Sequence, residues 1–227
     1  DIDYSPKIDS LALTNSDYSV TIDIKEQTKI NNASSGIREI ILPNGSKYTP
    51  KNQQVDIFNY NFSENGEYTF IAEDFAGNIT EKTIVIDNIN KVKPILTVSD
   101  YTKTLTNEDI TVVVTAKVHD EQIYRKGSGS FKSKTGMIIT NNGLRAEYTF
   151  KENGSQIFEF EDDWGNKVSE TITINNINKV SPIITLEMYE KSSSGELTKI
   201  TEANETYNDI VIKATTSTGS FQQFSSP

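Results

Sequence analysis

The side chains that could carry catalysis are few, and their spacing forms no catalytic pattern. His119 is the only histidine, and the chain has no cysteine. Any histidine-based triad would therefore depend on His119 alone. No nucleophile elbow, HExxH pair or phosphate-binding glycine loop occurs in the sequence. We predict that the chain is not an enzyme.

Two acidic turns offer a second kind of chemistry, calcium binding. Residues 74–78 read Asp-Phe-Ala-Gly-Asn, and residues 162–166 read Asp-Asp-Trp-Gly-Asn. In one interpretation each is a hairpin turn, in which the first aspartate accepts backbone N–H bonds and the glycine is left-handed. Calcium is the alternative, and it needs about six or more oxygen ligands. Because each turn offers so few carboxylates, the sequence favours the structural turn and predicts no cofactor.

Trp164 and a basic run are the candidate ligand contacts. Trp164 is the only tryptophan and stands in a polar turn, so its ring could anchor a sugar or a protein, or pack against a neighbouring strand or module. A Gly/Ser-rich run over residues 124–135 could steer an anionic glycan, or form a mobile surface loop, as its composition favours. The run carries four cations: Arg125, Lys126, Lys132 and Lys134.

An internal repeat positions these residues. Segments 62–98 and 150–186 align without a gap at an offset of 88, and Pro6, Pro94 and Pro182 mark the same point of three successive units. We therefore predict module 1 over residues 1–91, module 2 over 92–179 and the first part of a third module over 180–227. The linkers of modules 1 and 2 are nearly identical, which predicts a regular connection between modules.

Each unit has the pattern of short strands separated by turns. Apolar and polar residues alternate over residues 18–24, 58–62, 110–118 and 144–150, as half-buried strands require. Asn-Gly pairs between these segments supply turn residues. The sequence therefore predicts an all-β fold, with tandem immunoglobulin-like β-sandwich modules.

The penultimate hairpin of module 1 carries the most specific pattern. Gly66, Tyr68 and Phe70 match the strand in which immunoglobulin-type sandwiches place a tyrosine corner and then a core residue. Module 2 has Gln156 in place of Tyr68, so we expect the corner in module 1 only. The third unit lacks this hairpin. Its apolar residues at 183–186 and 210–214 predict two strands with open edges and an apolar face.

At these residues the sequence resembles the bacterial immunoglobulin-like (Big-type) repeats of Gram-positive surface and secreted proteins. The resemblance rests on Asn-Gly-x-Tyr-x-Phe at 65–70, Asp-x-x-Gly-Asn at 74–78 and Ile-Asp-Asn-Ile at 86–89. It implies a stalk or spacer in an extracellular or cell-surface protein. It leaves open an adhesin or carbohydrate-binding region, or accessory modules of a secreted glycan-degrading enzyme.

Charge and hydropathy restrict the expected partners. A formal net charge of −10 argues against nucleic acid, whose binding modules need a clustered basic surface. No stretch approaches the roughly 20 apolar residues of a spanning helix, so we expect no direct membrane insertion. The expected partners are neighbouring modules of the same longer chain, with a host protein or a glycan as an alternative.

Overall fold

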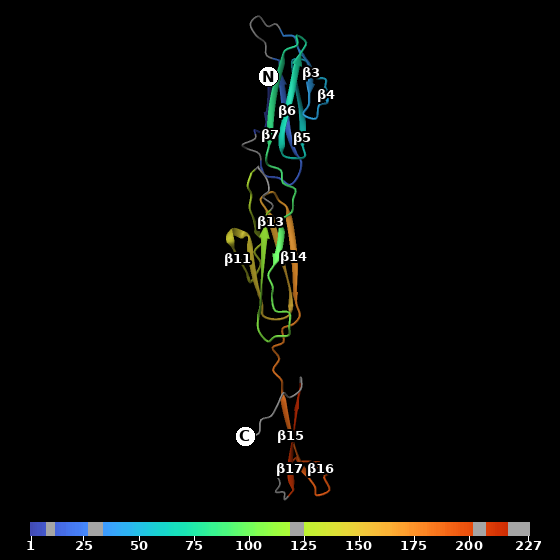
Figure 1. The fold of residues 1–227 in the computed structure, drawn as a ribbon, viewed down its shortest axis with the longest axis vertical. Helices are drawn as coiled ribbons and strands as arrows, with labels where there is room; N and C mark the ends of the chain where they lie inside the picture. Colours follow the sequence, from blue (N-terminus) through green and yellow to red (C-terminus); the bar gives the residue numbers. More distant parts are fainter. Residues whose placement is uncertain (8–11, 27–33, 119–124, 202–207, 218–227) are drawn as a thin grey trace. The chain divides into compact units, whose positions relative to one another are not determined.

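The computed structural model describes residues 1–7, 12–26, 34–118, 125–201 and 208–217 (Figure 1). Within these ranges the fold is all β, with antiparallel strands in five sheets and no α-helix. Contacts divide the chain into two compact units. One comprises Asp1–Lys103 and Asp109–Asn175, and the other comprises Thr104–Glu108 and the chain from Asn176 on.

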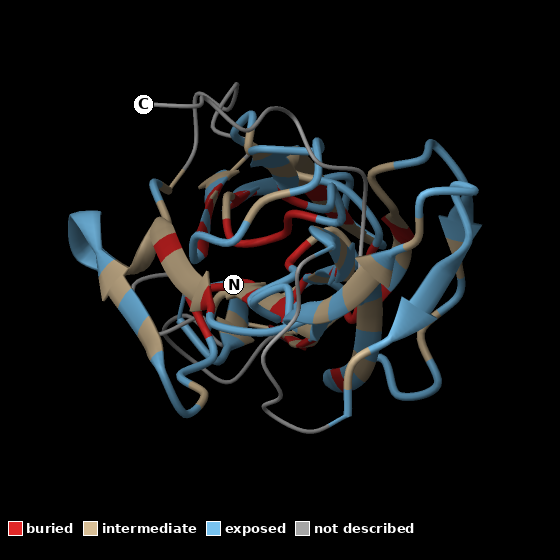
Figure 2. Cartoon of the chain, turned by 90° about the horizontal axis from the view of Figure 1, so that it is seen from below, coloured by how far each residue is buried: buried red, intermediate tan, exposed pale blue. Residues whose placement is uncertain are grey.

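Seven strands form the first sandwich, which is built from two sheets. One sheet has the order β1-β2-β5 and the other the order β4-β3-β6-β7. Ile22, Phe62 and Phe70, which come from both sheets, are at most 1% exposed. Figure 2 shows such buried residues in red, alternating with exposed ones along the strands. The strands are β1 (Ile2–Ser5), β2 (Tyr18–Lys25), β3 (Ile37–Ile41), β4 (Lys47–Tyr48), β5 (Val55–Phe62), β6 (Gly66–Asp74) and β7 (Ile79–Ile86).

The second sandwich repeats this plan with one change of sheet. Its sheets have the orders β11-β12-β9-β8 and β10-β13-β14. This is the constant-type immunoglobulin arrangement, strands D-E-B-A facing C-F-G. In the first sandwich the short strand β4 instead pairs with β3, on the opposite sheet. The elements are β8 (Ile95–Val98), β9 (Ile110–Lys117), β10 (Gly129–Phe131), β11 (Met137–Thr140), the 3-10 turn η2 (Asn141–Gly143), β12 (Arg145–Phe150), β13 (Gly154–Asp162) and β14 (Lys167–Ile174).

The tyrosine corner is present where the sequence predicts it. The Tyr68 hydroxyl donates to the backbone oxygen of Glu64 at 2.8 Å. In the second sandwich Gln156 Nε2 instead donates to the backbone oxygen of Ile157, its own neighbour. The predicted core position of this hairpin is also confirmed, since Phe70 is 0% exposed, as is its counterpart Phe158. These features confirm the predicted fold class of tandem immunoglobulin-like β-sandwich modules.

The loop interpretation of the Gly/Ser-rich run is wrong for residues 129–131. These residues form β10, which pairs with β13 so that Phe131 lies opposite Phe160. Phe131 is 3% exposed, and its ring contacts that of Phe160 at a centroid distance of 5.2 Å. A Cβ on Gly129 would lie 2.5 Å from the Phe160 ring, so this glycine allows close packing and is not a sign of flexibility.

Three further strands form the fifth sheet, in the order β16-β15-β17. They are β15 (Ile184–Lys191), β16 (Leu197–Lys199) and β17 (Asp209–Thr216). β15 and β17 carry the two apolar segments from which strands were predicted. β15 and β17 pair with each other antiparallel, with Leu186 opposite Ala214 and Met188 opposite Ile212.

Candidate functional site

The acidic turns are closed by their own side chains. Asp74 accepts from the backbone and the side-chain nitrogens of Asn78, both at 2.7 Å. The hydrogen bond from the Asn78 side chain lowers the pKa of Asp74 from 3.8 to about 2, because it stabilises the carboxylate. Gly77 between them has a φ of 83°. This geometry confirms the predicted structural turn.

The equivalent turn of the second sandwich has the same hydrogen bonds and is buried. Asp162 Oδ1 accepts from the backbone nitrogens of Trp164 at 3.0 Å and Asn166 at 2.8 Å, and Asp162 Oδ2 accepts from Asn166 Nδ2 at 2.9 Å. Asp162 and Asn166 are at most 5% exposed. Both carboxylate oxygens of Asp162 therefore accept hydrogen bonds within the turn.

Trp164 packs against the start of the basic run. The side chain is 6% exposed, and a Cβ on Gly127 would lie 2.1 Å from its ring. The backbone nitrogen of Asp163 donates to the Ser128 oxygen at 3.0 Å, which ties the turn to this loop. Packing is one of the two roles predicted for Trp164. Ligand contact would require the loop to move, and it stays a prediction.

The cations of the basic run do not form one positive surface. Arg125 Nε lies 2.9 Å from Asp87 Oδ1, and Lys134 Nζ lies 3.1 Å from Glu159 Oε2. Lys126 and Lys132 are exposed. Two of the four charges are thus compensated by neighbouring carboxylates, which weakens the attraction for a polyanion. Ligand contact at Arg125, Lys126, Lys132 and Lys134 stays a prediction, and His119 and Tyr124 lie outside the described residues.

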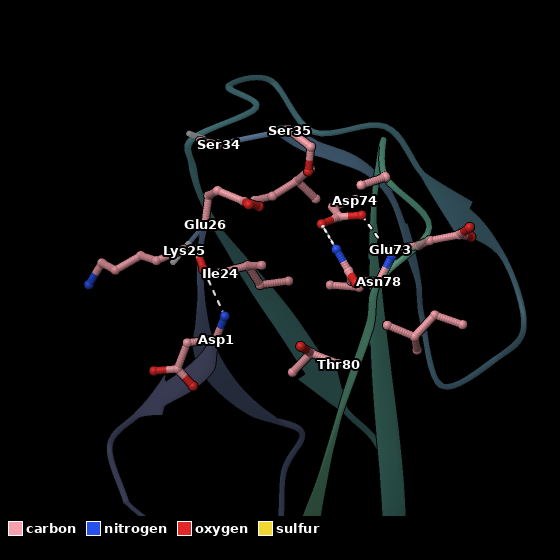
Figure 3. A pocket seen from close by; sticks show the side chains of 14 residues that line it. Asp1, Ile24, Lys25, Glu26, Ser34, Ser35, Glu73, Asp74, Asn78 and Thr80 are labelled. Atoms are coloured by element: carbon pink, nitrogen blue, oxygen red, sulfur yellow. Dashed lines mark hydrogen bonds between the residues drawn. The ribbon is translucent and has the colours of Figure 1, made fainter. Parts of the chain in front are cut away.

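A polar depression of about 770 Å³ lies at one end of the first sandwich (Figure 3). It is lined by the ends of β2 and β6 and by the starts of β3 and β7. Buried Ile24 and Ile37 line it together with Glu26, Ser35 and Asp74. In Figure 3 the hydroxyl and carboxylate groups surround the opening, and such groups can accept or donate hydrogen bonds to a small polar ligand.

Phe75 is an exposed aromatic side chain beside this depression. It lies between the lining residues Asp74 and Ala76, and it is 55% exposed. Trp164 was predicted from the sequence as a candidate ligand contact, and Phe75 was not. A signal was present, because the repeat aligns Phe75 with Asp163, so Phe75 differs between modules just as Trp164 differs from Ala76.

The chain leaves the first sandwich through an arrangement that we call the exit clasp, formed by residues 88–90. The backbone nitrogen of Thr14 donates to Asn88 O at 3.0 Å, and the nitrogen of Asn90 donates to Thr14 O at 2.9 Å. The side chain of Asn88, 0% exposed, donates to Ala12 O at 2.7 Å. These bonds hold the linker against a loop more than seventy residues earlier in the chain.

The same clasp closes the second sandwich. The Thr106 nitrogen donates to Asn176 O at 2.9 Å, and the Asn178 nitrogen donates to Thr106 O at 2.7 Å. Asn176 Nδ2 donates to Thr104 O at 2.7 Å. The two linkers thus share both their sequence and their hydrogen bonds.

Asn65 completes the clasp of the first sandwich, a role that was not predicted from the sequence. Its Nδ2 donates to Ile89 O at 2.6 Å, and its Oδ1 accepts from the Ile89 nitrogen at 2.9 Å. The Asn-Gly pair at 65–66 had been interpreted as turn chemistry alone. The presence of Asn153 at the equivalent position of the repeat was the available signal.

At the first exit, residues of the second sandwich also contact the linker. Asn166 Nδ2 donates to Asn90 O at 2.9 Å, and Arg125 forms its ion pair with Asp87. Pro94, which follows, is buried. The linker is therefore held both by the sandwich it leaves and by the one it enters.

The described residues contain no group of three or more His, Cys, Asp or Glu side chains that could hold a metal ion. The absence of a cofactor, with calcium as the alternative, stays a prediction. No helix among these residues is long and apolar enough to cross a membrane.

No protein-family model matches the sequence, and no curated protein matches it. Similar solved structures include fibronectin(III)-like modules of CbhA from Clostridium thermocellum, at 16% identity and a TM-score of 0.29 over 78% of this chain and 95% of that one. Murine CEACAM1b is 12% identical, with a TM-score of 0.31 over 77% of this chain and 99% of that one. The fold assignment rests on the strand order of this chain.

Proposed function

We propose that the chain is a non-catalytic array of immunoglobulin-like modules that acts as a stalk or spacer in an extracellular bacterial protein. The observation that best supports this is the exit clasp, which has the same backbone donors and acceptors at Asn88 and at Asn176. Such a clasp fixes where the chain emerges from a module, as a spacer requires. The resemblance to Gram-positive surface repeats supports the same role.

The contacts at the first linker give the spacer a defined joint. The Arg125–Asp87 ion pair is partly shielded, with each side chain 27% exposed. Pairs of this exposure contribute modestly and are screened by salt. The joint should therefore become looser when the pair is removed or when the ionic strength is raised.

We expect electron–electron distance measurements on the whole chain to test this. Spin labels on exposed strand positions of the two sandwiches should give one narrow distance distribution at low salt. Arg125→Ala should broaden it, because the linker loses its charged contact, while Lys126→Ala, which removes an exposed neighbouring cation, should leave it narrow. A wild-type distribution as broad as that of Arg125→Ala would contradict a spacer with a defined joint.

A second candidate function is carbohydrate binding at the depression of the first sandwich, as in an adhesin or an accessory module of a glycan-degrading enzyme. Phe75 supports it, since an exposed aromatic ring beside hydrogen-bonding groups suits the apolar face of a sugar. The carboxylates of Glu26 and Asp74 at the site favour a neutral glycan over an anionic one.

We expect the chain to be retained on a neutral-glycan column, and Phe75→Ala to abolish that retention because the sugar loses its stacking surface. Leu105→Ala is the matched control, since it removes a side chain that is 75% exposed elsewhere. Equal retention of all three proteins would argue against this site, and so would no retention of any.

A further inference from the structure

The first and the last strand of the first sandwich lie in different sheets. β1 belongs to the sheet β1-β2-β5, and β7, which leads into the linker, belongs to the sheet β4-β3-β6-β7. The two sheets pack on each other through the apolar core, and apolar contacts have no preferred direction. A pull along the chain acts on β1 and on the linker, so it acts to slide one sheet against the other.

β1 and the exit clasp lie at opposite ends of β2. β1 pairs with the second half of β2, where Ile2 lies opposite Ile24. The clasp lies at the other end, because the segment 12–17 that it holds leads directly into Tyr18. β2 has eight residues, and at about 3.3 Å each they span roughly 26 Å. Tension on the chain therefore runs along the strands and passes the clasp.

The clasp joins the two sheets by hydrogen bonds between parallel segments. Thr14 and Ile89 form a parallel bridge, in which the Thr14 nitrogen donates to Asn88 O and the Thr14 oxygen accepts from the Asn90 nitrogen. The Asn88 side chain adds a third bond, to Ala12 O. Thr14 leads into β2 of one sheet, and Asn88 follows β7 of the other. Because tension would draw these segments past each other along their common direction, the three bonds share the load.

The linker residues of the clasp are shielded from water. Asn88, Ile89 and Asn90 are 0%, 5% and 6% exposed. When a buried hydrogen bond is stretched, water cannot replace it at once, so breaking it costs more than breaking an exposed bond. The Asn65 amide also holds Ile89 at both its nitrogen and its oxygen, which fixes the linker beside the segment 12–17.

We propose that the exit clasp is a shear clamp, a set of hydrogen bonds loaded together, which raises the force at which the first sandwich unfolds under tension. This rests on the proposed spacer role and adds to it the bearing of load. The same three bonds recur at the second exit, where Thr104 and Thr106 bond the linker residues Asn176 and Asn178. Modules in series carry the same tension, so each of them needs its own clamp.

Two directions of pulling on the whole chain test this by single-molecule force spectroscopy. The chain has no cysteine, so a pair of engineered cysteines defines where the force acts. Handles at Asp3→Cys and Lys93→Cys pull along the chain, whereas handles at Ser19→Cys and Lys93→Cys pull apart two points at the clasp end. All three side chains are exposed.

We expect the first sandwich to unfold at an about threefold higher force along the chain than between the two points at the clasp end. Three bonds share the load in the first direction and break one at a time in the second, and forced unfolding depends on the barrier to unfolding. The free energy of unfolding has no direction, so it cannot produce such a difference. Equal forces in the two directions would overturn the proposal.

Proline substitutions locate the load on the clasp. Thr14→Pro removes the N–H that donates to Asn88 O, and it should lower the force along the chain by about a third, since one of three bonds is lost. The force in the other direction should not change. Thr106→Pro removes the equivalent N–H of the second clasp and is the matched control, because the handles place no load on that clasp. If Thr14→Pro does not fold, Asn88→Ala, which removes the side-chain bond to Ala12, takes its place.

These results separate the clamp from the spacer on which it rests. A narrow spin-label distance distribution together with equal unfolding forces would support the spacer and overturn the clamp. A broad distribution together with direction-dependent forces would contradict the defined joint and support the clamp. If Thr14→Pro lowers the force equally in both directions, the clasp only stabilises the fold, and the clamp is again overturned.

Discussion

Replacing Phe70 with alanine should destabilise the first sandwich by about 3–5 kcal/mol, while the unfolding of the second sandwich stays unchanged. Phe70 is 0% exposed, and its ring meets that of Tyr60 edge-on at a centroid distance of 5.1 Å. Truncation removes the ring contacts of Phe70 with Phe58 and Tyr60 of the opposite sheet and leaves a cavity between the sheets. The cost should therefore lie at the upper end of core truncations.

Two probes distinguish the sandwiches in a denaturant titration. Trp164 is the only tryptophan, so its fluorescence reports the second sandwich. Amide exchange of buried Ile22 and Ile84 reports the first. Phe158→Ala is the matched variant, since Phe158 is equally buried, and it should shift the fluorescence transition and spare the first sandwich. If either variant shifts both transitions equally, the sandwiches unfold as one cooperative unit.

Local patterns explain why the fold class could be predicted from the sequence. The alternation over residues 18–24 places every second side chain on one face, and Val20, Ile22 and Ile24 are at most 1% exposed. The tyrosine corner is equally local, since Tyr68 bonds a residue four positions earlier. Features that depend on a few consecutive residues can be predicted from the sequence without knowing which strands pair.

Pairing between distant segments could not be predicted in the same way. β4 joins the sheet of β3, whereas β11 joins that of β12, and no residue type in these short strands specifies the sheet. β10 was not predicted because Gly129 and Ser130 favour loops. They form a strand here because they pair with β13 and pack against Phe160.

The prediction of the candidate sites was limited in the same way, because it too depends on which segments pack together. Trp164 attracted attention as an aromatic residue in a polar turn, yet Gly127 allows the loop to cover its ring. Phe75, one position earlier in the equivalent turn, is the exposed aromatic. Residue type draws attention to these two turns, but the exposure of each aromatic side chain depends on the loop that packs against it.

Asn65→Ala should destabilise the first sandwich by about 2–6 kcal/mol, because it leaves two buried backbone groups without partners. Ile89 is 5% exposed, and both its nitrogen and its oxygen bond to the Asn65 amide. Each such orphaned group costs about 1–3 kcal/mol. The expected signature is faster exchange of the Ile89 amide, accompanied by a lower denaturant midpoint for this sandwich.

Asn65→Asp separates the two halves of this interaction. A carboxylate still accepts from the Ile89 nitrogen, but it cannot donate to the Ile89 oxygen and it places a negative charge against it. The loss of stability in Asn65→Asp should therefore approach that in Asn65→Ala at neutral pH. Asn44→Ala, in an exposed turn whose amide bonds only Ser46, should change stability by no more than about 0.5 kcal/mol. Unchanged Ile89 exchange in Asn65→Ala would mean that the clasp does not hold the linker in solution, and the spacer would then lose the feature that defines its exit.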